Sequence, residues 1–245
     1  MIRRGYCFSP CWAILLRNCC KGIMFHFGQA QVFDDIAMVS RAFRKQGKPV
    51  VLVSIGTQVH AGHVALLRTA KRIPGAVVVV VARENQPAFA EERVDAVYID
   101  HSEPERTLID ASPRLTRRIA LLNLVGPTDV IYGEDDYAFL LQTQRAITDL
   151  HIPVKVHSVP TVRMPDGIAI SSRNALIPAE EREKALALSA AVTAGALRGV
   201  DAAKQVLSAA GVEPDYVRCE DNRVYVAATF GGVQLIDSAS DLNQE

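Results

Sequence analysis

Residues 48–82 read KPVVLVSIGTQVHAGHVALLRTAKRIPGAVVVVVA and contain two apolar, mainly β-branched runs, Val50–Val53 and Val77–Val81. Between them lies a segment with a helical pattern, 62–72, which Pro74-Gly75 ends. Continuous apolar runs of this kind are typical of parallel strands that are buried on both faces. The stretch therefore predicts a β-α-β unit whose two strands are parallel neighbours joined by a right-handed crossover.

The alternation of helices and strands continues on both sides of this unit. Before it, apolar residues recur at helical spacing from Val32 to Arg44. After it, strand and helix patterns alternate at 94–99, 115–125, 129–132, 137–150 and 154–159. This order predicts an open, doubly wound α/β sheet, in which ligands bind at the carboxyl ends of the strands.

The pattern changes near Pro178. We expect two helices there, followed by three short antiparallel strands, at 178–198, 202–210, 216–219, 223–229 and 234–236. Gly231-Gly232 would form the hairpin turn before the last strand. The sequence therefore predicts a main domain over 24–161 and a small C-terminal α+β domain over 162–245.

Composition and charge favour small-molecule partners. The 27 Lys and Arg residues balance 27 Asp and Glu, and aromatic residues make up only 6%, so we expect neither a nucleic-acid nor a membrane partner. Four of the five cysteines lie in the first twenty residues at a spacing that fits no common zinc site, and the remainder is typical of a reduced, cytoplasmic protein. We interpret residues 1–23 as a leader, or as an extension from a start codon assigned upstream of Met24.

The residues VHAGH, Val59–His63, follow directly after the first buried strand. His60 and His63 are three residues apart, so they project from neighbouring positions in the first turn of a helix. Free backbone N–H groups at a helix start attract anions, and Gly62 allows a phosphate to approach the main chain. Two imidazoles there can donate hydrogen bonds to a polyphosphate from which pyrophosphate is displaced. Capping or surface histidines are the alternative, which the position after a buried strand disfavours.

Two further motifs are candidates to complete this site. The first is SSRN, Ser171–Asn174, which combines two hydroxyl groups with the fixed positive fork of an arginine, although it is also ordinary loop composition. The second is GEDDY, Gly133–Tyr137, at the carboxyl end of a predicted strand. Its Asp135 and Asp136 either hold Mg²⁺ beside the phosphates or cap the next helix, and the sequence leaves both possibilities open.

With these motifs, the chain resembles the pantothenate synthetase (pantoate–β-alanine ligase) family of HIGH-signature nucleotidyltransferase-like folds. The most specific part of the resemblance is VPTVRMPDGIAISSRNALIPAEER, residues 159–182. It implies a Rossmann-like domain, a small C-terminal lid domain and a homodimer. It also implies a two-step reaction with Mg²⁺ and ATP. Pantoate attacks the α-phosphate of ATP to give pantoyl adenylate and pyrophosphate, and the amine of β-alanine then displaces AMP.

The resemblance also implies roles for individual residues. His60, His63 and Arg173 match family residues that bind the ATP phosphates and stabilise the adenylation transition state, and they are the predicted catalytic residues. The predicted nucleotide-binding residues are Gly62, Asp136, Ser171, Ser172 and Arg173. No residue is predicted to be a dedicated metal ligand.

The chain departs from the family in the part that binds pantoate. The two pantoate-binding glutamines of the family fall at Ala88 and Phe139, neither of which can make those hydrogen bonds. The family's lysine in the G-x-K-D-Y string is Asp135, which reverses the charge facing phosphate. Gln86 and Gln142 are the nearby candidates to replace the lost glutamines.

Two other segments also differ. The family's Pro-Thr-Met-Gly is Ser-Ile-Gly-Thr at 54–57, and the segment between Phe89 and Leu115 is shortened. The alternative to a working ligase is therefore a degenerate paralogue that binds nucleotide, or pairs with a true synthetase, without turnover. A third possibility is adenylyl transfer to another small acid.

Overall fold

The computed structural model describes residues 13–16, 23–56, 58–101 and 112–242. Six parallel strands form the main sheet in the order β3-β6-β5-β4-β7-β8. The strands are β3 (Gln31–Val32), β4 (Val50–Ser54), β5 (Val77–Ala82), β6 (Ala96–Ile99), β7 (Asp129–Gly133) and β8 (Lys155–Val159). The helices of this domain are α1 (Ile36–Lys45), α2 (Ala61–Lys71), α3 (Pro87–Glu91), α4 (Pro113–Val125) and α5 (Tyr137–Asp149). This arrangement confirms the predicted doubly wound α/β fold.

The two apolar runs are buried because helices cover both faces of the sheet. All six residues of β5 are buried, and successive side chains point to opposite faces. Val77 and Val79 join one core with residues of α1, α4 and α5, whereas Val78 and Val80 join the other with residues of α2 and α3. A strand enclosed in this way has no polar face, and this explains its unbroken run of valine.

The strand order reverses beside β4, which pairs with β5 on one side and β7 on the other. Chain segments leaving these strands therefore diverge and leave a crevice at the carboxyl edge of the sheet, where α/β proteins bind ligands. The loop after β4 leads to His60, and the loop after β7 contains Asp135 and Asp136.

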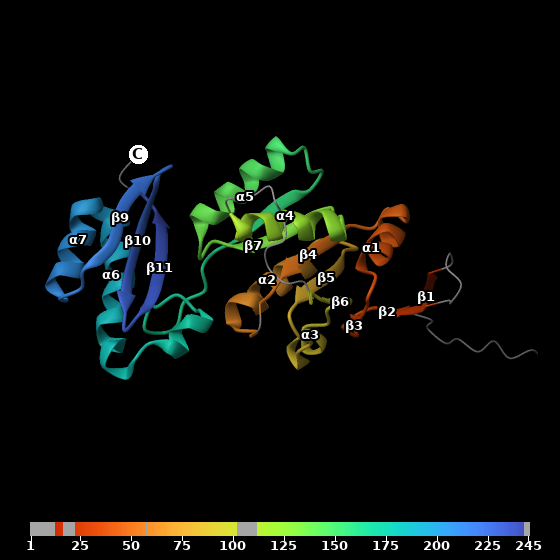
Figure 1. Ribbon diagram of the computed structural model, residues 1–245, viewed down its shortest axis with the longest axis horizontal. Helices are drawn as coiled ribbons and strands as arrows, with labels where there is room; N and C mark the ends of the chain where they lie inside the picture. Colours follow the sequence, from red (N-terminus) through yellow and green to blue (C-terminus); the bar gives the residue numbers. More distant parts are fainter. Residues whose placement is uncertain (1–12, 17–22, 57, 102–111, 243–245) are drawn as a thin grey trace, which may run out of the picture.

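A second, smaller body follows β8 and lies at one end of the molecule (Figure 1). It contains an antiparallel sheet in the order β11-β10-β9, with β9 (Pro214–Glu220), β10 (Arg223–Phe230) and β11 (Val233–Ser240). Its helices are α6 (Arg182–Arg198) and α7 (Val200–Ala209), preceded by the 3₁₀ turns η1 (Ser172–Leu176) and η2 (Ala179–Glu181). A separate core of buried residues supports this small C-terminal domain. The boundary between residues 161 and 162 stays a prediction.

The close approach of α6 to the small sheet depends on Gly195. A Cβ atom there would lie 2.8 Å from Cγ1 of Val224 on β10 and 3.2 Å from Cβ of Ala203 on α7.

Among the described residues, no helix combines the length and the apolar character that crossing a membrane requires.

Two of the predicted helix starts were wrong, one helix was missed, and the last strand, expected over 234–236, extends to Ser240. The segment at Val32 is strand β3 rather than the start of a helix, because Asp35 caps α1 by accepting a hydrogen bond from the Met38 N–H at 2.8 Å. The helix expected from Pro178 is divided, and α6 begins only at Arg182 after η2. Helix α3 was not predicted, since five residues carry too little periodicity.

A short antiparallel pair precedes the main domain. It consists of β1 (Ala13–Leu16) and β2 (Ile23–His26), so five residues of the expected leader, 13–16 and 23, are paired in strands. The rest of that leader, 1–12 and 17–22, lies outside the described residues. Its assignment as a leader or an upstream extension stays a prediction.

A buried carboxylate ties three segments of the main domain together. Asp95, just before β6, is 3% exposed and accepts hydrogen bonds from the backbone N–H groups of Gly28 and Val78, both at 2.8 Å. It also forms an ion pair of 2.8 Å with Lys71 at the end of α2. Each of these donors loses its partner if the carboxylate is removed.

We expect Asp95→Ala to lower the free energy of unfolding by roughly 3 kcal/mol, because it leaves two amides and an ammonium group unpaired. Urea denaturation followed by circular dichroism would measure the change. The control is Glu92→Gln, which breaks the exposed pair with Arg68 and should change stability far less. Equal effects of the two variants would contradict a structural role for the Asp95 network.

Candidate active site

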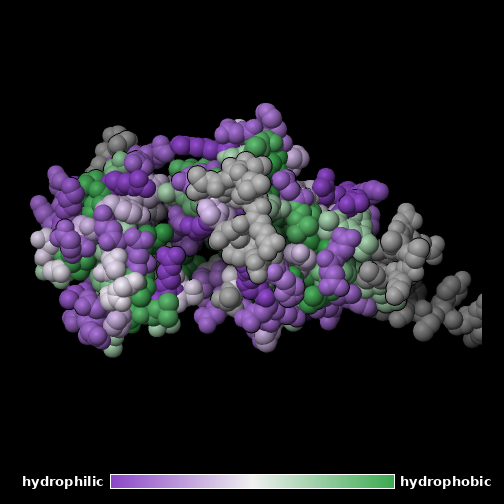
Figure 2. Space-filling view, viewed as in Figure 1, coloured by the Kyte–Doolittle hydropathy of each residue, from purple (hydrophilic) through white to green (hydrophobic). Residues whose placement is uncertain are grey.

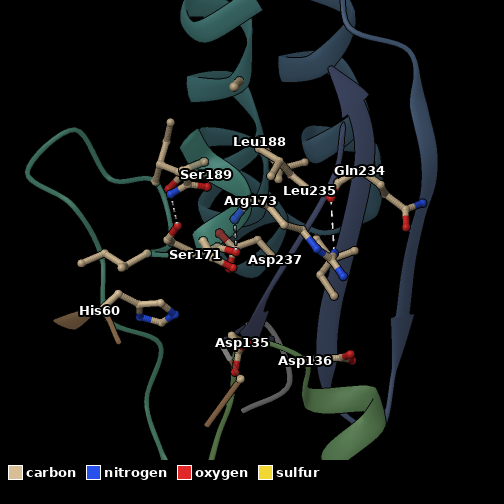
Figure 3. A pocket seen from close by; sticks show the side chains of 18 of the residues that line it. His60, Asp135, Asp136, Ser171, Arg173, Leu188, Ser189, Gln234, Leu235 and Asp237 are labelled. Carbon is tan, nitrogen blue, oxygen red and sulfur yellow. Dashed lines mark hydrogen bonds between the residues drawn. The ribbon is translucent and has the colours of Figure 1, made fainter. Parts of the chain in front are cut away.

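A cavity of about 300 Å³ lies between the carboxyl edge of the main sheet and the C-terminal domain. Figure 2 shows the surface hollowed between the two bodies, with hydrophilic residues around the hollow. In Figure 3, His60, Asp135 and Asp136 lie on one side, while Ser171, Arg173 and Asp237 lie on the other. The lining also includes Gly56, Gln58, His63, Arg114, Ser172 and Asn174. The cavity therefore brings together side chains from all three predicted motifs.

His60 and His63 form a stacked pair at the start of α2. Their ring centroids are 3.9 Å apart with an interplanar angle of 26°. His60 is the N-cap residue, but its side chain makes no capping hydrogen bond, so the capping alternative is wrong. Both Nδ1 atoms are buried without a hydrogen-bond partner within the described part of the chain. Because buried polar atoms are rarely left unpaired, a bound ligand is the natural partner of this pair.

Gly62 has a packing role in addition to the one predicted. A Cβ atom at this position would lie 3.0 Å from both Cε1 and Nδ1 of His60. The missing side chain therefore leaves room for the His60 ring beside the first turn of the helix, and it also leaves the N–H groups there accessible.

Burial keeps both imidazoles neutral. It lowers the pKa of His63 to about 4, and the neighbouring His60 lowers it further. Burial also lowers the pKa of His60, an effect that the negative charge of Asp135 partly opposes. At neutral pH the pair can donate N–H groups to an anion without adding positive charge.

The SSRN loop reaches the cavity from the C-terminal domain. Ser171 caps the η1 turn by accepting a hydrogen bond from the Arg173 N–H at 3.2 Å. The Arg173 guanidinium donates to the carbonyl oxygen of Gln234 on β11 at 3.4 Å. Nearby, the Arg163 guanidinium binds both carboxylate oxygens of Asp237, at 2.6 and 2.9 Å. The loop is thus anchored to β11 and faces the histidine pair across the cavity (Figure 3).

The two aspartates of GEDDY have different surroundings. Asp136 caps α5 by accepting a hydrogen bond from the Phe139 N–H at 3.2 Å, and its other oxygen accepts from Arg114 at 2.5 Å. Asp135 makes no hydrogen bond or ion pair within the described part of the chain, and it lines the cavity. Of the two possibilities left open by the sequence, helix capping is thus confirmed for Asp136, whereas Asp135 is available to a cation.

The outer residues of GEDDY join the two domains. The buried Arg223 on β10 donates to Oε2 of Glu134 at 3.4 Å and lies 4.0 Å from the ring centroid of Tyr137. Glu134 also accepts a hydrogen bond from the Ser158 hydroxyl at 2.8 Å. Arg223 was not predicted, since an arginine that opens an antiparallel strand carries no signal of a contact 89 residues away.

A second cavity, of about 160 Å³, adjoins the first and shares both histidines with it. Its lining includes Ser54, Gly62, Arg114, Arg118, Tyr132, Asp135, Asp136 and Thr161. The two glutamines predicted to compensate for the lost ones do not line either cavity. Gln86 instead accepts a hydrogen bond from the Val59 N–H at 3.0 Å and so supports the loop before His60.

The departures from the family pattern differ in their distance from these cavities. Phe139 is buried under Arg114 and Arg118, whereas Ala88 lies on α3 and does not line either cavity. Within the altered segment 54–57, Ser54 and Gly56 line the cavities, and residue 57 lies outside the described residues. In the shortened segment, residues 102–111 also lie outside them.

The sheet, the histidine pair at a strand–helix turn and the facing SSRN loop define an α/β protein with a candidate phosphate-binding site at the carboxyl edge of its sheet. Comparison with known proteins narrows this class. The sequence model described as Pantoate-beta-alanine ligase matches residues 116–240. Pantothenate synthetase from Corynebacterium jeikeium is 35% identical over 274 residues, covering 86% of this chain and 90% of the relative. The chain belongs to the pantoate–β-alanine ligase family.

Further relatives agree with this assignment. Pantothenate synthetase from Mycobacterium ulcerans is 34% identical, covering 91% of each chain. A crystal structure of the Thermus thermophilus enzyme has a TM-score of 0.70 at 25% identity, covering 86% of this chain and 99% of the other. The ligase from Francisella tularensis, described as a complex with Beta-gamma ATP and Beta-alanine, has a TM-score of 0.68 at 21% identity, covering 86% and 97%.

The buried His63 should make stability depend on pH. Its pKa of about 4 in the folded protein lies below the ordinary value of 6.5, so the unfolded chain binds more protons between these values. Stability should therefore fall as the pH drops from 6.5 toward 4, by up to about 1.4 kcal/mol per pH unit from this residue.

Urea denaturation at several pH values would measure this contribution as the difference between the wild type and His63→Gln. The exposed histidine variant His151→Gln is the matched control and should keep the wild-type slope. If His63→Gln also keeps that slope, then His63 is not held neutral in the folded protein.

Proposed function

We propose that this protein is an ATP-dependent ligase that condenses pantoate with β-alanine through a pantoyl-adenylate intermediate. The observation that carries this proposal is the stacked, neutral histidine pair, which faces the SSRN loop across a cavity at the carboxyl edge of the sheet. Its relatives named pantothenate synthetase, at 35% and 34% identity, support the same activity. The Francisella ligase, described as complexed with Beta-gamma ATP and Beta-alanine, shares the fold.

In this proposal His60, His63 and Arg173 act on the phosphates of ATP. A carboxylate oxygen of pantoate bonds to the α-phosphorus while the bond to the pyrophosphate oxygen breaks, and negative charge increases on the leaving group. Donors already in position on both sides of the cavity stabilise that charge. The amine of β-alanine then attacks the acyl carbon, loses a proton, and AMP leaves.

The remaining predicted residues hold the nucleotide in this proposal. Gly62 opens the start of α2 to a phosphate, and Ser171 and Ser172 add donors from the facing loop. Asp136 holds Arg114 in the wall of the cavity proposed for the nucleotide, and it caps α5.

The site also fits Mg²⁺ that enters with ATP. Asp135 presents a carboxylate without a partner to the cavity, and carboxylate and phosphate oxygens are the ligands that Mg²⁺ prefers. Within the described ranges, no group of three His, Cys, Asp or Glu residues could hold a metal by itself. A cation between Asp135 and the phosphates would also relieve the repulsion that the loss of the family's lysine creates.

A cytoplasmic homodimer is part of the same proposal. The family resemblance supports the dimer. The exposed free thiol of Cys219 supports a reducing compartment.

The alternative of a degenerate paralogue is not favoured, because the residues expected to bind the phosphates all lie around one cavity system. A second cavity remains beside the histidine pair for the acid.

Pantoate-dependent exchange of labelled pyrophosphate into ATP tests the proposed first step. We expect the wild type to exchange, and we expect His60→Ala to lose about 10²- to 10³-fold because a donor to the developing charge is removed. His151→Ala, at an exposed histidine outside the site, should retain wild-type exchange. The proposal fails if the wild type shows no pantoate-dependent exchange above that of His60→Ala.

The proposed role of Asp135 predicts a changed requirement for Mg²⁺. Asp135→Asn should raise the Mg²⁺ concentration for half-maximal exchange about tenfold, equivalent to about 1.4 kcal/mol of binding free energy. Asp149→Asn, at the exposed end of α5, is the matched control. If the two variants give identical Mg²⁺ titrations, Asp135 does not bind the metal.

A further inference from the structure

Three residues that line the second cavity have buried polar atoms for which the described residues provide no partner. Thr161, His60 and His63 line this cavity, and Oγ1 of Thr161 and the Nδ1 atoms of both histidines are buried and make no hydrogen bond within the described part of the chain. A cavity of about 160 Å³ suits a small molecule rather than a nucleotide. These atoms therefore point to a small polar ligand that binds beside the phosphate site.

One wall of this cavity contains the guanidinium group of Arg118 from α4. Its Cζ lies 4.0 Å from the ring centroids of both Tyr132 and Phe139, so two aromatic rings hold it. It also donates a hydrogen bond to Oγ1 of Thr143 at 2.8 Å, and the Thr143 hydroxyl donates in turn to the carbonyl oxygen of Phe139 at 2.8 Å. The guanidinium is thus fixed before any ligand binds.

Arg118 differs from the other two arginines of α4, because each of those pairs with a carboxylate. Arg114 pairs with Asp136, and Arg117 pairs with the buried Asp100. Among the described residues, no carboxylate pairs with Arg118 within ion-pair distance. Burial lowers the pKa of Arg118 to about 10, which still leaves it positively charged at neutral pH. A half-buried, fixed cation without a carboxylate is a site for an anion.

The two neighbouring carboxylates, Asp135 and Asp136, do not serve as the anionic partner of Arg118. Asp136 accepts from Arg114, and Asp135 lines both cavities as the candidate partner of a cation. Asp136 and Asp135 raise the pKa of Arg118, but their effects are smaller than those of burial, Tyr132 and Arg114.

We propose that Arg118 binds the carboxylate of the acid substrate in the second cavity, an inference that rests on the proposed ligase function. One carboxylate oxygen would accept from the guanidinium, and the other would remain free to bond to the α-phosphorus beside His60 and His63. Pyrophosphate leaves with the electrons of the broken phosphorus–oxygen bond. This chain would therefore recognise the acid through the positive charge of Arg118, whereas the family pattern uses the side-chain amides of two glutamines.

The proposal also gives Phe139 a function. The phenyl ring cannot hydrogen-bond a substrate, but it packs against Arg114 at 3.8 Å and Arg118 at 4.0 Å. The residue that replaces a family glutamine is thus part of the surface that holds the new cation in place.

Steady-state kinetics of Arg118→Met and Arg118→Lys test the proposal. Methionine keeps much of the packing but removes the charge, so the KM for pantoate should rise roughly 10- to 100-fold, as expected for the loss of a charged hydrogen bond. The KM for ATP should stay within about twofold. Lysine keeps the charge without the planar fork, and should restore part of the loss. Arg145→Met, at an exposed arginine of α5, is the matched control.

Calorimetric binding of pantoate and of an ATP analogue separates this inference from the proposed function. If the wild type turns over and Arg118→Met keeps its KM for pantoate while binding the ATP analogue normally, Arg118 is not the acid-binding residue and the ligase proposal stands. If the wild type binds pantoate without turnover and Arg118→Met does not bind it, the ligase proposal fails and the Arg118 site stands. Absence of pantoate binding by the folded wild type overturns both.

Discussion

The burial of β4 between two helical layers fixes the geometry of the whole site. Its apolar side chains contact both cores, so the strand can neither slide nor rotate without exposing valine and leucine to water. Its carboxyl end is therefore held in one place, and His60 begins α2 a few residues later. Asp135 follows β7, which pairs directly with β4, so the same constraint positions the second half of this wall.

The cavity also depends on the attachment of the C-terminal domain. Arg223 joins that domain to Glu134 and Tyr137, which come from the same five-residue motif that supplies Asp135 and Asp136. A single motif thus caps a helix, contacts the second domain and faces the ligand cavity. Because Glu134 also accepts from Ser158, the carboxylate is held by a contact within the main domain as well.

Much of the fold could be predicted because its signals are local. The run of valine in β5, the ending of α2 and the histidine pair all lie within 35 neighbouring residues, where periodicity and turn residues are informative. The contacts of Arg118 and Arg223 could not be predicted in this way. A charged residue on a helix or at a strand end is ordinarily exposed, and these two are enclosed only because segments distant in sequence pack against them. Similarly, the capping function of Asp136 follows from where α5 begins, and sequence fixes such boundaries only to within a few residues.

The ion pair between Arg114 and Asp136 forms part of the wall of two cavities, because both residues line the cavity proposed for the nucleotide and the smaller cavity beside it. A ligand that shifts this pair from one side alters the shape and charge that the other side presents. Such an effect is reciprocal, since binding free energies in a closed cycle must sum to zero. Whatever factor ATP applies to the affinity for the acid, the acid applies to the affinity for ATP. If ATP and the acid occupy these cavities as proposed and each shifts this pair, the two ligands are thermodynamically linked even where they do not touch.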